Sequence, residues 1–135
     1  MPNKNECYTY FRICGDFDPE EVTALLGIRP RTAWCTRDRR RDGTCYPFSN
    51  WETEHCSAYD VEIDRQMQQT LALLRGKEEL LSRFRQTHEV MMTLEVVPTV
   101  YPSESSPCLA PGLEVMRFCV ATGTQLDIDL YVGEE

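Results

Sequence analysis

Three segments of the chain alternate between apolar and polar residues with the period of two that predicts β-strands. They cover residues 7–14, 88–97 and 125–132. In each segment one series of side chains is mainly apolar and is expected to face the core; in the last segment this series is Leu126, Ile128 and Leu130. The opposite series is more polar. The sheet is therefore predicted to have one apolar face and one face that is at least partly polar.

The helix predicted after the first strand has clear start and stop signals. Asp18 is a natural N-cap, and Pro19 fits the first helical position. Gly27 is expected to end the helix after about two and a half turns. Its buried side chains are predicted to be Val22, Leu25 and Leu26.

Two further helical regions are predicted from apolar residues at helical spacing. The first extends from residue 65 to about residue 87, with Asp64 available as its cap, and Gly76 is expected to bend it or to divide it in two. The second begins at Pro111 and ends at Gly123. Its buried side chains are predicted to be Leu113, Met116 and Val120.

Residues 32–36 and 50–56 predict a hairpin whose turn is rich in arginine. Residues 59–64 alternate again, which favours a short extended piece or else the start of the next helix. The elements then follow the order strand, helix, hairpin, helix, strand, helix, strand. This order predicts an α+β fold: a mixed or antiparallel sheet of about five strands with helices packed on one face.

The length of 135 residues corresponds to a single domain, residues 1–135. Two passages, residues 8–35 and 90–131, share the plan strand, loop, short helix closed by glycine, strand. A diverged internal duplication of a strand-helix-strand unit is one explanation of this shared plan.

Three parts of the sequence resemble the bacterial family called domain of unknown function 4279. They are the opening FRICGDFDPEEVTALLGIRP, Trp51 followed by Glu54, and the closing LAPGLEVMRFCVATGTQLDIDLYV. The resemblance covers nearly the whole chain. It implies a small intracellular bacterial domain and brings no established activity with it.

The chain is acidic, with a net charge of −8 and a pI of about 4.8. This charge repels nucleic acid and anionic membrane surfaces, so we expect neither as a partner and favour a basic protein. One stretch differs: residues 29–41 hold six arginines and one aspartate. We interpret its Arg39-Arg40-Arg41 run as a solvated loop on an acidic body.

The location is expected to be cytoplasmic. Seven cysteines are an odd number for a disulfide framework, and a chain of this length can fold without disulfides. The first residues lack the apolar core of a signal peptide, and no window approaches a membrane span. The sequence does not indicate the oligomeric state.

Motifs for known chemistries are missing. The sequence has no glycine-rich phosphate loop, Gly-x-Ser-x-Gly, His-Glu-x-x-His or Cys-x-x-Cys. Cys35, Cys45, Cys56 and His55 could supply zinc ligands if the hairpin brought them together, but their irregular spacing favours free cysteines. We therefore predict no metal site and no cofactor.

The polar series of the predicted strands forms the candidate binding surface. If the strands belong to one sheet, these side chains share its polar face. They are Tyr8, Tyr10, Arg12, Glu95, Asp127, Asp129 and Tyr131. Trp34 and Trp51, on the two arms of the hairpin, are added as core anchors or, if exposed, as aromatic platforms beside arginines.

Two hypotheses follow for the function. The first is a non-enzymatic protein-interaction module with an acidic binding surface, for example an immunity or inhibitor protein that recognises a basic toxin. The alternative is a small-molecule or metal-dependent enzyme that uses Asp127, Asp129 and Glu95 as acid, base or metal ligands.

Overall fold

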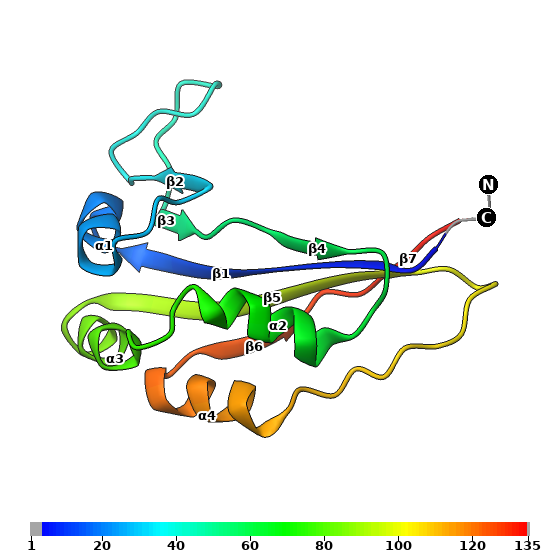
Figure 1. The fold of residues 1–135 in the computed structure, drawn as a ribbon. Helices are drawn as coiled ribbons and strands as arrows, with labels where there is room; N and C mark the ends of the chain where they lie inside the picture. Colours follow the sequence, from blue (N-terminus) through cyan, green and yellow to red (C-terminus); the bar gives the residue numbers. More distant parts are fainter. Residues whose placement is uncertain (1–3, 135) are drawn as a thin grey trace.

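The computed structural model describes residues 4–134, which form seven strands and four helices (Figure 1). The strands are β1 (Glu6–Asp16), β2 (Thr32–Trp34), β3 (Ser49–Glu52), β4 (Cys56–Ala58), β5 (Glu89–Val100), β6 (Gln125–Ile128) and β7 (Tyr131–Val132). The helices are α1 (Pro19–Leu26), α2 (Ile63–Ala72), α3 (Glu78–Thr87) and α4 (Leu113–Thr122).

All seven strands belong to one mixed sheet, with the order β2-β3-β1-β5-β6. The long antiparallel pair of β1 and β5 forms its centre (Figure 1). β4 pairs with β1, β7 pairs with β5, and the pairs that β5 makes with β6 and β7 are parallel. This arrangement confirms the predicted α+β fold with a mixed sheet.

The helices pack on one face of the sheet. Two apolar clusters form there, and each contains side chains from both the central strands and the helices. The larger cluster consists of Phe11, Ile13, Phe17, Val22, Leu26, Trp51, Leu74, Leu81, Phe84, Met92 and Phe118. The smaller cluster consists of Cys7, Ile63, Met67, Leu94, Val96 and Val115. We call the opposite side of the sheet the open face, because no helix of residues 4–134 covers it.

Helix α1 confirms its predicted start and stop. The Asp18 carboxylate accepts a hydrogen bond from the backbone N–H of Glu20 at 3.0 Å. Gly27 adopts the left-handed conformation, with φ of 66°, and its N–H donates to the carbonyl of Thr23. The cap and the glycine therefore hold this short helix while Val22 and Leu26 are buried.

The middle helical region is divided into α2 and α3, with Gly76 at φ of 80° between them. Because α2 already begins at Ile63, the interpretation of residues 59–64 as an extended piece is wrong, and so is the prediction that Asp64 caps this helix. Asp64 instead accepts a 2.6 Å hydrogen bond from the N–H of Gly112, the N-cap residue of α4. Because α2 packs beside α4, the Asp64 carboxylate caps the neighbouring helix instead of its own.

Helix α4 turns the opposite side inward from the one that was predicted. Leu113, Met116 and Val120 are exposed, with Val120 at 84%. The residues buried in their place are Val115, Phe118 and Thr122. Both sides of this helix carry apolar residues, so contact with α2, α3 and the sheet selects the buried side.

The last predicted strand is divided into β6 and β7. The N–H of Asp129 donates to the carbonyl of Val96, and regular strand structure stops before it resumes at Tyr131. Leu130 lies in this interruption and is 48% exposed, so its predicted inward orientation is wrong.

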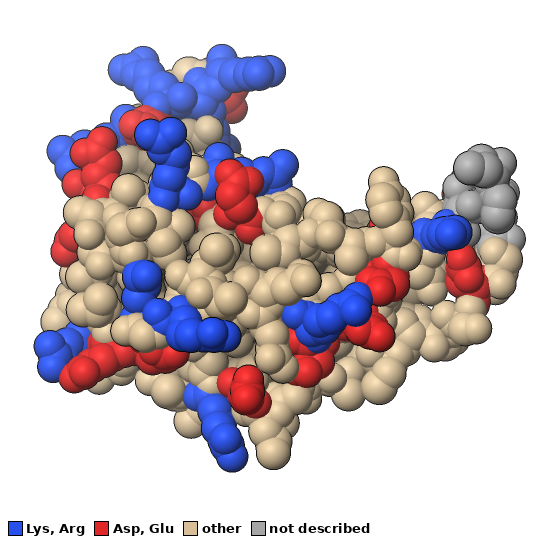
Figure 2. All heavy atoms as spheres, in the orientation of Figure 1, with Lys and Arg blue, Asp and Glu red and all other residues tan. Residues whose placement is uncertain are grey.

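The predicted hairpin is present as β2 and β3, which pair antiparallel. Cys56, predicted at its end, belongs to β4. The arginine-rich loop between β2 and β3 projects from the body, and Figure 2 shows its arginine side chains gathered at the tip. In the strand order, β2 and β3 add to the sheet on one side of β1, and β2 is the edge strand.

The two strand-helix-strand passages both connect parallel strands. β5 and β6 are direct neighbours, whereas β3 lies between β1 and β2 and is antiparallel to both. The internal duplication remains a prediction.

Candidate functional site

The sheet register brings three of the predicted site residues into one row on the open face. Tyr10 of β1 is paired with Glu95 of β5, and Glu95 is paired with Asp127 of β6. Tyr8 and Arg12 lie on the same side of β1 as Tyr10 because they are two residues away. Residues separated by more than a hundred positions in the chain thus meet at the centre of this face.

Glu95 and Asp127 form a hydrogen-bonded carboxyl pair. Glu95 is only 9% exposed. Burial, and then the hydrogen bond and charge of Asp127, raise the pKa of Glu95 from 4.5 to about 7, while the Arg12 charge opposes this rise. Glu95 therefore holds its proton up to about pH 7.

Asp129 and Tyr131 extend the acidic side of the site. Both are exposed, and the Tyr131 hydroxyl donates to Asp129 Oδ2 at 3.1 Å. This carboxylate raises the pKa of Tyr131, first through the hydrogen bond and then through its charge. Tyr131 belongs to β7 and is paired with Thr99 of β5, so it lies at one end of the open face.

A stack of aromatic rings forms the other side of the row. The His55 ring lies parallel to the ring of Tyr8, with a centroid separation of 4.5 Å, and to that of Tyr10, at 4.7 Å. Arg31 Nη1 lies 2.6 Å from the imidazole nitrogens. Burial, and then the Arg31 charge, lower the pKa of His55, so the imidazole is neutral at pH 7 and can accept this hydrogen bond.

Tyr10 is the member of the stack that is paired with Glu95 of the carboxyl pair. Burial, and then the charges of Glu95 and Glu52, raise its pKa to about 12. Its hydroxyl is therefore protonated at neutral pH and can donate to a ligand.

Arg12 is held by polar neighbours from β3. Its Nε donates to Asn50 Oδ1 at 2.6 Å and lies 4.0 Å from Glu52 Oε2. Asn50, which is fully buried, donates in turn to Glu52 at 2.8 Å. The Arg12 guanidinium lies over the Phe48 ring at 5.8 Å. These contacts fix one cation beside the carboxyl pair.

The two tryptophans have different roles. Trp51 is fully buried, and its indole N–H donates to Thr23, so its assignment to a binding surface is wrong. Its side chain points to the helix-covered face, where α1 packs. Trp34 is half-buried on the open side and stacks on Tyr46 at 4.8 Å. The expected contact of a tryptophan with arginine is replaced by Arg12 over Phe48 and Arg40 over Tyr46.

The hairpin does not assemble the zinc ligands that were considered. Within residues 4–134, no group of three or more His, Cys, Asp or Glu side chains is placed to hold a metal ion. All seven cysteines lie as free thiols.

Sequence reasoning did not place His55, Arg31 or Asn50 on the candidate binding surface. His55 lies in the connection between β3 and β4, where no alternation identifies its direction. Arg31 was treated only as part of a basic stretch. Their roles depend on how β2, β3 and β4 assemble beside β1, which is a tertiary property.

A family model described as a domain of unknown function, DUF4279, matches residues 5–133. The chain belongs to this family. The open face lies within the matched part of this DUF4279 domain. No curated protein and no solved structure matches the chain. Among the described residues of the DUF4279 domain, no helix is long and apolar enough to cross a membrane.

Proposed function

We propose that this DUF4279 domain is a non-enzymatic protein-interaction module whose open face binds a basic protein segment. The observation that carries the proposal is the makeup of that face, in which aromatic rings lie directly beside carboxyl groups. Tyr8, Tyr10 and His55 form the stack, and Glu95 with Asp127 forms the adjoining pair.

The aromatic stack supports contact with a protein surface. Tyrosine provides a large contact area at a small cost in side-chain entropy, and its hydroxyl remains available for hydrogen bonds. Tyr8 and Tyr10 are half-buried, and His55 already restricts both rings. A partner would therefore meet a surface that is largely organised before binding.

The charges of the open face support a basic partner. Its carboxyl groups outnumber its guanidinium groups; they are Glu6, Glu52, Glu95, Asp127 and Asp129, against Arg12, Arg31 and Arg40. The surplus agrees with the net charge of −8. A negative surface accelerates its encounter with a positively charged partner and repels an acidic one. An immunity or inhibitor protein for a basic toxin in the bacterial cytoplasm is a concrete form of this function.

The test begins with capture of the partner from the native cell and its identification by mass spectrometry. The purified partner is then titrated into wild-type domain, into a variant with Asp127 and Asp129 changed to Asn, and into Asp129→Lys. We expect a basic partner and a Kd at least about tenfold weaker for both variants, equivalent to about 1.4 kcal/mol.

Glu114→Lys is the matched control, because Glu114 is also an exposed carboxylate but lies on α4, on the opposite side of the sheet. It changes the net charge by the same amount as Asp129→Lys. Equal weakening by both substitutions would mean that only the total charge matters. An acidic partner would also contradict the proposal.

One observation favours acid–base catalysis as a second candidate function. The Glu95 carboxyl has a pKa raised to about 7 by burial and by Asp127, and Tyr10 is its cross-strand partner on β1. Such a group could give and take a proton at neutral pH. Turnover of a small-molecule substrate that is lost in Glu95→Gln but retained in Glu20→Gln, at an exposed position of α1, would support this candidate.

A further inference from the structure

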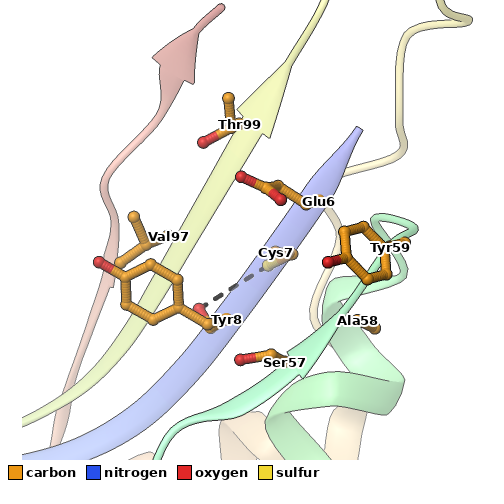
Figure 3. Close-up of a pocket in the computed structure, with 8 residues that line it drawn as sticks. All are labelled: Glu6, Cys7, Tyr8, Ser57, Ala58, Tyr59, Val97 and Thr99. Carbon is orange, nitrogen blue, oxygen red and sulfur yellow. Dashed lines mark hydrogen bonds between the residues drawn. The ribbon is translucent and has the colours of Figure 1, made fainter. Parts of the chain in front are cut away.

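A recess of about 290 Å³ opens on the open face at the end where β1, β4 and β5 lie together (Figure 3). The side chains that define it are Glu6, Tyr8, Ser57, Tyr59, Val97 and Thr99. The sheet register places Tyr8 opposite both Ser57 and Val97, and Glu6 opposite Thr99. The recess therefore lies next to Tyr8, at the end of the aromatic stack that is farther from the carboxyl pair.

Two tyrosine rings stand at the sides of this recess. Figure 3 shows the rings of Tyr8 and Tyr59 on either side of Cys7. Tyr8 is fixed by its stack with His55, whereas Tyr59 is 81% exposed. An exposed aromatic face at this position can be covered by a ligand that enters between the rings.

The polar groups of the recess are hydroxyls, which can accept hydrogen bonds, and one carboxylate. Within residues 4–134, the Glu6 carboxylate takes part in no ion pair. Figure 3 shows Glu6 and Thr99 at one end of the recess and the Ser57 hydroxyl at the other. A cationic group that donates several hydrogen bonds would complement this arrangement.

The size of the recess argues against a ligand larger than one side chain, and its chemistry argues against a covalent reaction at Cys7. Its volume lies at the lower limit of ligand pockets, about 300 Å³, and is suited to one side chain. Cys7 also lines the recess, but its thiol is buried in the smaller apolar cluster, and burial raises its pKa to about 11. It is therefore protonated at neutral pH and is a poor nucleophile, so binding fits better than covalent reaction.

We propose that this recess binds an arginine side chain of the basic partner, with the guanidinium between Tyr8 and Tyr59 and in contact with the Glu6 carboxylate. Arginine fits better than lysine because its planar group stacks on aromatic rings and its fork of N–H donors matches a carboxylate. The inference rests on the proposed function in one respect, that the partner is basic.

The test is an NMR titration of the isotope-labelled domain with Nα-acetyl-arginine amide. We expect saturable shifts at the backbone amides of Tyr8, Ser57 and Thr99. Nα-acetyl-citrulline amide has nearly the same shape without the charge and should cause no such shifts. Nα-acetyl-lysine amide should bind several times more weakly than the arginine probe.

Two variants separate the contributions of charge and ring. Glu6→Gln and Tyr59→Ala each alter an exposed side chain and should weaken binding of the arginine probe at least about fivefold. Glu20→Gln removes one exposed carboxylate on α1 and should leave binding unchanged. Equal shifts with the citrulline probe, or unchanged binding by Glu6→Gln, would overturn the proposal.

The probe experiment does not require the native partner, so the two proposals can fail separately. If the arginine probe binds but the identified partner is unaffected by Asp129→Lys, the recess stands and the proposed interaction face is wrong. If that partner depends on Asp129 but the arginine probe causes no saturable shifts, the interaction face stands and the recess proposal is wrong.

Discussion

Phe11 and Tyr10 are neighbours on β1, but they face different surroundings. Phe11 is fully buried under the helices, where its ring meets Phe118 edge-on at 6.2 Å. Tyr10 is half-buried on the open face, where its contacts are the His55 ring and polar groups. The two sides of a single strand thus belong to an apolar core and to an ordered polar surface.

The difference shows how a sheet face can be organised without being covered. The helix-covered face is fixed by close packing of apolar side chains. The open face is fixed by specific pairs, such as Arg12 with Asn50 and Glu95 with Asp127. Substitutions on the open face should therefore alter binding more than they alter folding.

The strongest test of this comparison replaces each neighbour by alanine. Phe11→Ala should lower the free energy of unfolding by about 3–5 kcal/mol, because it leaves a cavity in the core. Tyr10→Ala should lower it by only about 1–2 kcal/mol, since it removes one stacking partner and part of a half-buried ring. Urea unfolding followed by circular dichroism measures both values.

If the m value, the slope of the free energy of unfolding against urea concentration, is the same in both variants and wild type, the two free-energy losses can be compared directly. If Tyr10→Ala costs as much as Phe11→Ala, the open face is a second core, and the proposed binding surface is wrong.

The second test uses the pH dependence of Glu95. The folded protein holds this proton up to a pKa of about 7, whereas the unfolded chain releases it near 4.5. Wild-type stability should therefore fall as the pH rises through this interval, by at most about 3 kcal/mol from this group. Glu95→Gln cannot titrate, so its stability relative to wild type should increase between about pH 5 and about pH 8.

Urea unfolding of both proteins at the two pH values gives this difference. Glu20→Gln on α1 is the control, because Glu20 is exposed and its replacement should give a difference that is flat with pH. A flat difference for Glu95→Gln as well would show that the pKa of Glu95 is not raised in the folded protein.

The third test concerns α1, which packs on the helix-covered face. Asp18→Ala removes the hydrogen bond to the N–H of Glu20 and should cost about 1 kcal/mol. The melting temperature should then fall by roughly 3–6 °C. Asp16→Ala, an exposed aspartate two residues earlier, should leave it nearly unchanged. Equal melting curves for Asp18→Ala and wild type would mean that the cap contributes nothing.

The sequence predicted the features that depend on local chemistry. Alternation on β1 separated Phe11 from Tyr10, and the residues Asp18 and Gly27 located both ends of α1. The prediction from sequence failed where the local pattern allowed two arrangements equally well. Helix α4 carries apolar residues on both sides, and only its contacts with other elements decide that Val115 is buried and Val120 exposed.

The candidate site was predictable in part for the same reason. Alternation placed Glu95 and Asp127 on the polar side of their strands. Their pairing depends on the register that the α4 connection sets between β5 and β6, and no local pattern reports that register. The stack of His55 on Tyr8 likewise depends on β3 and β4, which flank His55 in the chain, both pairing with β1.

The smallest expected effect on stability comes from Asp129→Lys. Asp129 is exposed and its side-chain partner, the Tyr131 hydroxyl, is exposed as well, so the free energy of unfolding should change by less than about 0.5 kcal/mol. Binding of the basic partner should nevertheless weaken about tenfold at low salt. In high salt the gap between Asp129→Lys and wild type should shrink, because screening shortens the range of the lost attraction. Titrations at several salt concentrations measure this gap. If Asp129→Lys unfolds the domain, the open face is required for folding, and its separation from the helix-covered face does not hold.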